Sequence, residues 1–229
     1  MTQNKNPEAL IDNFDDFKDE PTNGYRFLSN FYEGELITLP GVTWNAFFGS
    51  MDRQPWCEKF LVDYPEELPE GPVYFSTGEH AFAAMKCWGV NPEQFFDIVC
   101  ADGPGPAKSL GRSCQLREDW EVVKLDVMAA VVRSKFTLER DEGQRLLRTY
   151  DALLIEGTWW RDDVWGVQLK KNNTSQTAVG RNWLGTLLMA RRAELRAETD
   201  YEVTSRALES NSKTAVDGWQ RPAWMSTAR

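Results

Sequence analysis

The chain has 229 residues, enough for one sizeable domain with extensions, and its 35 acidic and 26 basic side chains give a net charge of -9. This acidity argues against simple coating of nucleic acid. The sequence has no run of 18 apolar residues to span a membrane, and its first 20 residues lack the basic-then-apolar form of a signal peptide. We therefore expect a cytoplasmic protein with no membrane partner.

The acidic residues gather outside the centre of the chain. Residues 1–24 contain six acids and two bases, and residues 45–72 contain the same numbers. We expect a polar acidic arm at 1–24, one domain at 25–199 with an insert at about 45–72, and a flexible polar tail at 200–229.

The cysteines and the histidine of the sequence indicate whether a metal site is expected. The four cysteines have no C-x-x-C spacing, and His80 is the only histidine. This set does not match the usual zinc sites, so we expect no metal and no cofactor. Ten tryptophans and twelve phenylalanines are ample for a core, and we expect some of these rings to stack on a flat ligand.

Residue patterns predict an α+β fold, a mostly helical single domain with a few short strands. Residues 36–44 and 73–76 favour short extended segments, and helices are expected at 92–100, 120–136, 141–150 and 184–197. The Gly-Pro-Gly-Pro run at 103–106 predicts a break before a compact turn at 107–112. The polar stretch at 168–182 predicts a mobile loop.

A further helix is expected between residues 76 and 88. Ser76 and Glu79 have the S-x-x-E spacing of a capping box. Glu79, Phe82 and Lys86 fall on one stripe, because seven residues are nearly two turns, and the carboxylate and the amine are about 10 Å apart along the axis. By itself, the S-x-x-E pattern at the start of a helix more often indicates only a helix cap. His80 projects about 100° away from Glu79, and we expect it to be structural.

Seven segments in series resemble the NADAR family, whose YbiA-like members are N-glycosidases. The segments are Phe27–Tyr32, Gly78–Phe82 with Lys86, Ala107–Arg112, Trp120 to Phe136, Leu153–Glu156, Asp162–Gly166, and Gly180–Met189 with Arg192. Their order and spacing fit the family over residues 25–199, apart from the insert. Two departures are Gly78, where the family usually has serine, and a longer Asn/Thr/Ser/Gln run in place of the glycine-rich loop before Gly180.

The resemblance implies three catalytic residues. Glu79 would be the principal carboxylate, since cleavage of an N-glycosidic bond needs stabilisation of an oxocarbenium-like ribose and a proton for the departing nitrogen. Asp162 would supply a second carboxyl or hold ribose hydroxyls, although on residues alone it equally suits an Asx turn. Lys86 would bind a phosphate or a carboxylate, or capture a ring-opened ribose as a Schiff base.

The resemblance also implies a substrate-binding set. Its members are Asn30, Phe31, Arg112, Trp120, Trp165 and Asn182. Arginine suits a phosphate or a diphosphate, tryptophan a base or a ribose, and asparagine a ribose hydroxyl. Each residue type also has an ordinary structural use, in a salt bridge, in the core or in a loop.

These roles together imply a hydrolase of an N-glycosidic bond to a phosphorylated ribose. The first reading is removal of ADP-ribose from guanine in a nucleotide or in DNA, with a cognate ADP-ribosyltransferase as a possible partner. A second reading is cleavage of phosphorylated ribosylamino-pyrimidine intermediates of riboflavin biosynthesis, which are small phosphoribosyl metabolites. A third is a non-catalytic module that binds ADP-ribose or NAD.

Overall fold

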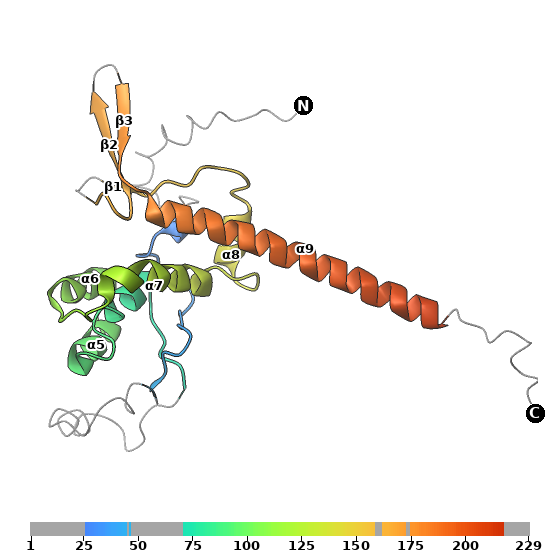
Figure 1. Cartoon of the computed structure of the whole chain (residues 1–229), viewed down its shortest axis with the longest axis horizontal. Coiled ribbons are helices and arrows are strands. Elements are labelled where there is room, and N and C mark those ends of the chain that lie inside the picture. The colour runs from blue at the N-terminus through green and yellow to red at the C-terminus, as the bar shows by residue number, and fades with distance from the viewer. Residues whose placement is uncertain (1–25, 45, 47–70, 159–161, 173–174, 218–229) are drawn as a thin grey trace, which may run out of the picture.

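The computed structural model describes residues 26–44, 46, 71–158, 162–172 and 175–217 (Figure 1). The predicted arm at 1–24 and almost all of the predicted insert at 45–72 lie outside the described residues, so both stay predictions.

The fold is α+β and mostly helical, as the sequence predicts. In chain order its elements are η2 (Arg26–Leu28), α4 (Gly78–Ala84), α5 (Pro92–Val99), α6 (Pro104–Ser113), α7 (Trp120–Lys135), α8 (Asp141–Leu147), β1 (Gly157–Thr158), β2 (Val167–Asn172), β3 (Ser175–Val179) and α9 (Trp183–Asp217). Two isolated bridges, Ile37 with Phe75 and Thr43 with Pro72, join the predicted extended segments.

Helix α4 lies at the centre of the fold. It packs against α5, α6 and α7, and α7 and α8 pack in turn against α9. All seven residues of α4 are buried. The small sheet has the order β1-β2-β3, with β1 parallel and β3 antiparallel to β2, and it stands beside the start of α9 (Figure 1).

Helix α4 starts one residue later than the predicted capping box. Thr77 is the N-cap, and its hydroxyl accepts the backbone N–H of His80 at 3.3 Å. The Ser76–Glu79 capping box is therefore wrong, which leaves the Glu79 carboxyl available to the pocket described below. The predicted structural role of His80 is confirmed, because the ring is buried and its nitrogens lie 2.8 Å from the Thr77 hydroxyl and 3.1 Å from the Ala101 carbonyl.

Two predicted irregular segments are regular. The Gly-Pro-Gly-Pro run starts α6 instead of ending structure, because Gly103 adopts φ 95° as the N-cap and proline in the first turn needs no N–H partner. The predicted mobile loop at 168–182 contains most of the β2–β3 hairpin, which runs in register from Gln168 opposite Val179 to Asn172 opposite Ser175.

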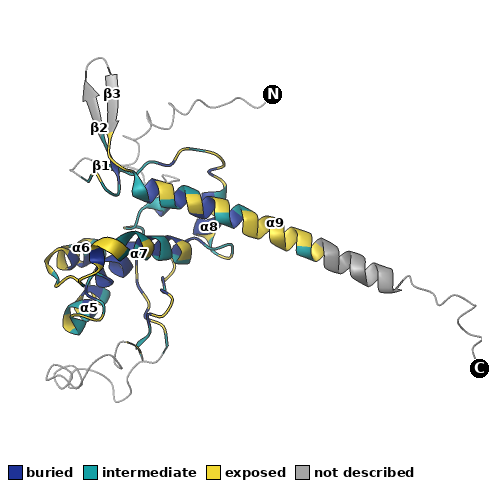
Figure 2. Ribbon diagram, in the orientation of Figure 1, coloured by how far each residue is buried: buried dark blue, intermediate teal, exposed yellow. Residues whose placement is uncertain are grey.

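Helix α9 is longer than predicted and continues to Asp217. Residues 200–217 of the predicted flexible tail are thus helical, and 218–229 lie outside the described residues. Figure 2 shows that the first half of α9 has buried and intermediate residues among exposed ones, whereas its second half, as far as its exposure is described, is almost entirely exposed and projects from the domain. No described helix is long and apolar enough to cross a membrane.

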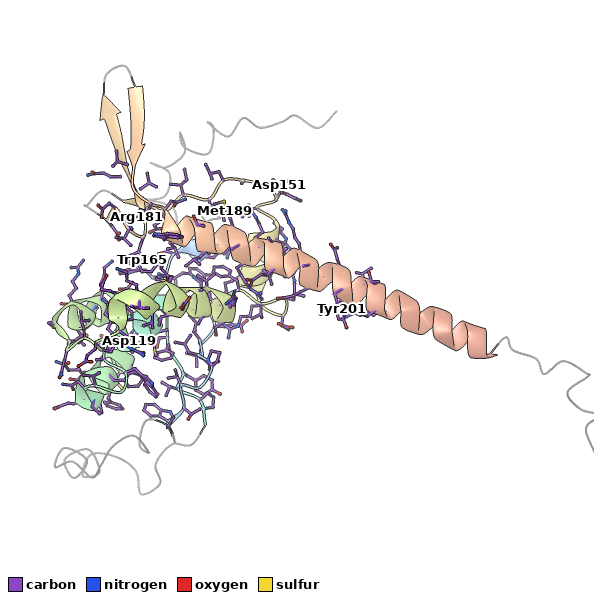
Figure 3. All side chains as sticks on the ribbon, in the orientation of Figure 1. Asp119, Asp151, Trp165, Arg181, Met189 and Tyr201 are labelled. Atoms are coloured by element: carbon purple, nitrogen blue, oxygen red, sulfur yellow. The ribbon has the colours of Figure 1, made fainter. Side chains whose placement is uncertain are left out.

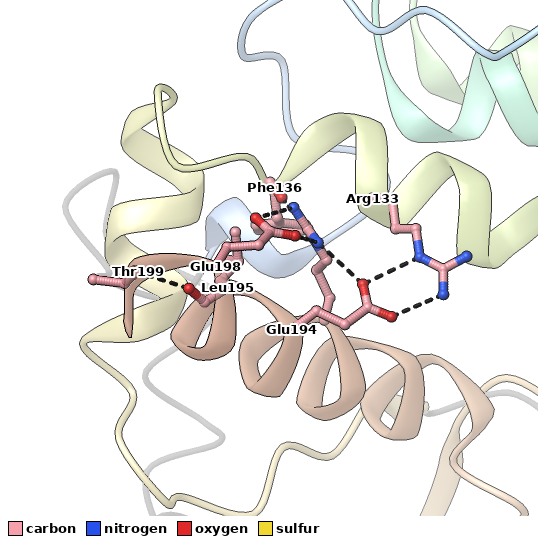
Figure 4. Close-up of polar contacts among 7 residues, drawn as sticks. Arg133, Phe136, Glu194, Leu195, Glu198 and Thr199 are labelled. Atoms are coloured by element: carbon pink, nitrogen blue, oxygen red, sulfur yellow. Dashed lines mark hydrogen bonds and ion pairs between the residues drawn. The ribbon is translucent and has the colours of Figure 1, made fainter. Parts of the chain in front are cut away.

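Charged contacts fix the first half of α9 to α7 (Figure 4). Arg191, only 8% exposed, donates to the Phe136 carbonyl at 2.8 Å and pairs with Glu198 at 2.7 Å. Glu194 accepts from both Arg191 and Arg133. Because Arg191 and Glu194 each have two charged partners, this network holds α9 more firmly than isolated surface pairs would.

Close packing of α4 on α6 generates a stability prediction. A Cβ at Gly111 would lie 2.7 Å from the Cβ of Ala83, whereas a Cβ at Gly105 meets nothing within 4 Å. We expect Gly111→Ala to lower the free energy of unfolding by about 1–3 kcal/mol, since the helices must separate. Gly105→Ala is the matched control in the same helix and should be neutral or stabilising by up to ~1 kcal/mol. Urea denaturation tests this, and equal midpoints for the two variants would contradict the packing account.

Candidate functional site

One pocket of about 420 Å³ opens between α4, α6, α7 and the start of α9. Its lining residues are Ser29, Asn30, Phe31, Glu79, Phe82, Lys86, Lys108, Arg112, Met128, Glu156, Asp162, Trp165 and Leu184. The structure thus brings together seven of the nine residues that the sequence singles out. The other two, Trp120 and Asn182, are not among the lining residues.

The start of α4 is tied to the loop that forms one wall. The Glu79 N–H donates to the Asn30 carbonyl at 3.0 Å, and the Asn30 amide donates to the Met128 sulfur at 3.4 Å. A Cβ at Gly78 would lie 3.0 Å from the Asn30 side-chain oxygen. Glycine at this position therefore allows the loop and Glu79 to approach closely.

Three carboxyls and three cations share the pocket. The carboxyls belong to Glu79, Glu156 and Asp162, and the cations to Lys86, Lys108 and Arg112. Such a mixed lining suits a ligand with both a phosphate and a sugar, because cations bind the phosphate and carboxylates bind hydroxyls or stabilise positive charge.

Burial raises the pKa values of two of the three carboxyls. Burial raises the pKa of Glu79, and the charges of Lys108, Lys86 and Arg112 act against this rise. Burial also raises the pKa of Glu156 to about 7, reinforced by the charge of Asp162. Perturbed carboxyls in a pocket are typical of acid–base catalysis.

Lys86 is held beside Glu79 by polar and aromatic contacts. Its ammonium donates to the Gly111 carbonyl at 3.1 Å and lies 5.6 Å and 5.9 Å from the ring centres of Phe82 and Trp120. Burial lowers the pKa of Lys86, and the charge of Glu79 opposes this. The contacts with the rings and the carbonyl stabilise the charged form.

Aromatic rings make the apolar part of the pocket. Phe82 lies between Trp120 and Trp165, with both ring-centre distances 5.1 Å. Trp120 is only 6% exposed and supports Phe82 from behind. Figure 3 shows Trp165 near the start of α9, where its carbonyl accepts the Leu184 N–H at 3.0 Å. Trp165 is thus placed to contact a ligand, and Trp120 is placed to hold the wall.

Asp162 and Asn182 both have structural contacts. The Asp162 carboxylate accepts the Trp165 N–H at 2.9 Å, as in an Asx turn, while also lining the pocket. The Asn182 amide bonds to backbone groups of Leu154 and Glu156. Asn182 thus holds the segment that carries Glu156. Its geometry favours this structural role over a direct contact with a ribose.

Sequence reasoning did not assign Lys108 or Glu156 to the site. Both lie inside segments that resemble the NADAR family, Ala107–Arg112 and Leu153–Glu156, and this was the only available signal. Lys108 places its ammonium 4.9 Å from the ring centre of Phe31, which is 40% exposed at the pocket.

Lys135 is buried next to the pocket and contacts Ser29, one of the lining residues. It is only 3% exposed, and its ammonium donates to the Ser29 carbonyl at 2.6 Å. Burial lowers its pKa to about 7, against the charges of Glu142 and Glu156. Its hydrogen bond to Ser29 fixes the end of α7 to the loop at 29–31.

The fold and the pocket define the class of protein. A mostly helical α+β domain holds paired carboxyls beside aromatic rings and cations, an arrangement suited to glycosidic bond cleavage. Residues 17–196 match the NADAR domain, and the chain belongs to the NADAR family.

Named relatives are similar to this chain over different shares of their length. An N-glycosidase of Nostoc punctiforme is 36% identical over 127 residues, which make up 54% of this chain and 76% of the relative. N-glycosidase YbiA of Escherichia coli K12 is 35% identical over 124 residues, or 53% of this chain and 71% of the relative. The riboflavin biosynthesis protein PYRR of Zea mays is 32% identical over 176 residues, which cover 72% of this chain but 26% of the maize protein.

A solved structure extends the similarity to the fold. The NMR structure of the E. coli protein YbiA matches with a TM-score of 0.53 and 27% identity, over 79% of this chain and 84% of that chain. The resemblance to the NADAR family and the predicted α+β, mostly helical fold are therefore confirmed.

The buried Lys135 gives a pH-dependent stability prediction. Its pKa is about 7 in the folded state against an ordinary value of 10.5, so between these values the unfolded chain binds a proton that the folded chain lacks. The stability of the wild type, relative to Lys135→Met, should therefore rise with pH from 7 towards 10.5, by at most about 1.4 kcal/mol per unit. Urea denaturation of both proteins at pH 7, 8 and 9 measures the difference. A difference that does not change with pH would contradict the buried state of Lys135.

Proposed function

We propose that this protein hydrolyses the N-glycosidic bond between a phosphorylated ribose and a nitrogen base, with ADP-ribose on guanine as the substrate. Its family and its similarity to N-glycosidases make it an N-glycosyl hydrolase. The observation that carries the substrate class is the meeting of Lys86, Lys108 and Arg112 with three carboxyls in one pocket.

The pocket supports a phosphorylated ribose in particular. Three cations exceed what a neutral nucleoside needs and suit a phosphate or a diphosphate. Phe31 and Trp165 offer rings on which a base can stack. With a net charge of -9, contact with nucleic acid should be local to the modified base and should not involve a long duplex footprint.

A second candidate substrate is a phosphorylated ribosylamino-pyrimidine of riboflavin biosynthesis. The names of two relatives favour it, the maize protein and a riboflavin biosynthesis protein of Vibrio vulnificus, which is 29% identical over 63% of this chain and 37% of its own length. Such a ligand carries one phosphate and needs only part of the cation cluster. Incubation with each substrate, followed by mass spectrometry of the released base, distinguishes the two.

Glu79 is the principal carboxylate of the proposed reaction. We expect Glu79→Gln to lower turnover by about 10²–10⁴-fold, because the positive charge that develops on the ribose loses its partner. Binding of ADP-ribose, measured by calorimetry, should change only a few-fold. Glu93→Gln, at an exposed position on α5, is the matched control and should keep full activity. Near-normal turnover of Glu79→Gln would reduce Glu79 to a structural residue.

The contacts of Lys86 favour an electrostatic role. We expect Lys86→Arg, which keeps the charge but cannot form an imine, to retain turnover within about tenfold of wild type. Lys86→Met should lose more, because it removes the cation. Borohydride treatment during turnover provides the check. Complete loss of activity in Lys86→Arg, together with a borohydride-trapped adduct on Lys86 in the wild type, would establish the Schiff-base route instead.

A further inference from the structure

Backbone hydrogen bonds fix Glu156 at the wall of the pocket. Its N–H donates to the Asn182 side-chain oxygen at 3.0 Å, and its carbonyl accepts the Val167 N–H at 2.7 Å. The other end of the Asn182 amide donates to the Leu154 carbonyl at 2.9 Å. Both backbone groups of Glu156 are therefore bonded, although Glu156 precedes the first residue of β1.

The backbone conformation of Asn182 and the absence of a side chain at Gly185 make these hydrogen bonds possible. Asn182 adopts a left-handed backbone with φ 52°, a conformation that asparagine tolerates better than most residues other than glycine. A Cβ at Gly185 would lie 2.6 Å from the Asn182 amide and 2.2 Å from the Leu154 carbonyl, so the first turn of α9 must leave this space empty. The two hydrogen bonds of the Asn182 amide therefore fix the segment that carries Glu156.

The two glutamates of the pocket have different electrostatic surroundings. Burial and the charge of Asp162 raise the pKa of Glu79, and three cations, Lys108, Lys86 and Arg112, oppose this rise. For Glu156 the favourable charges of Lys108 and Lys135 are countered by the negative charges of Asp162 and Glu79. Burial and these negative charges raise the pKa of Glu156 to about 7. Environments that separate two carboxyls in this way indicate which one is the acid.

We propose that Glu156 is the general acid of the site, that Glu79 is the carboxylate that stabilises charge, and that Asn182 positions Glu156. This assignment rests on the proposed N-glycosidase function. The Glu156 carboxyl donates its proton to the departing nitrogen as the bond from ribose C1 to that nitrogen breaks. Water then adds to C1 and passes a proton to the Glu156 carboxylate. The products are the base with its N–H restored and a ribose with a hydroxyl at C1.

The first test compares turnover and its pH dependence. Glu156→Gln should lower kcat by about 10²–10⁴-fold with little change in KM, and the loss of rate above about pH 7 should disappear, since an amide is no acid at this pH. Glu156→Asp keeps the carboxyl and should recover part of the rate with a pH-dependent limb. Wild-type kcat and an unchanged pH limb in Glu156→Gln would overturn the assignment.

The positioning role of Asn182 is tested with Asn182→Gly, since glycine tolerates the positive φ but lacks the amide. We expect kcat to fall by about tenfold or more with an unchanged KM, and the pH limb assigned to Glu156 to move. A parallel loss of folded protein with an unchanged pH limb would show that Asn182 is only structural.

A titration without substrate separates this assignment from the proposed function. In protein with ¹³C-labelled glutamate carboxyls, identified through Glu156→Gln and Glu79→Gln, NMR should show Glu156 losing its proton at a higher pH than Glu79. The reverse order would overturn the assignment. If the wild type hydrolysed neither proposed substrate, the proposed function would be wrong, and the order of the two titrations would still decide which carboxyl holds the proton.

Discussion

The cost of holding six charged groups in one partly buried pocket is the constraint on which the rest of the structure depends. Carboxylates and cations removed from water are stable only when they face opposite charges or hydrogen-bond donors. The pocket meets this condition by interleaving the two signs, so that Glu79 is surrounded by Lys86, Lys108 and Arg112. The charges do not balance fully at Glu156, because burial and the charge of Asp162 raise its pKa to about 7. In the proposed mechanism, this raised pKa allows Glu156 to donate a proton near neutral pH.

The architecture around the pocket keeps these charges in place. Helix α4 is buried on all sides and carries Glu79 at its first turn, while the close approach of α6 at Gly111 brings Lys108 and Arg112 to the same cavity. The chain before β2 supplies Glu156 and Asp162, and the start of α9 fixes that chain through Asn182. Each charged residue therefore comes from an element whose own packing determines where it lies, which is the preorganisation that catalysis needs.

The sequence predicts helix α7 at nearly its observed bounds, because residues 120–135 contain no glycine or proline that would interrupt a helix. It misplaces α6, since Gly103 and Pro104 favour a break as much as a helix start, and it misses the polar β2–β3 hairpin, which lacks apolar alternation. The resemblance to the NADAR family correctly assigns Glu79, Lys86 and Asp162 to one pocket. Long-range packing places Lys108 and Glu156 in the pocket and brings Asn182 to the backbone of Leu154 and Glu156. A local sequence pattern cannot predict such packing.

The most direct measurement is a crystal structure of Glu79→Gln with a guanosine that carries ADP-ribose. The account predicts ribose C1 between residue 79 and Glu156, the diphosphate against Lys108 and Arg112, and the base against Phe31 or Trp165. A ligand bound elsewhere on the protein, or bound in the pocket with its phosphates away from these cations, would contradict the account.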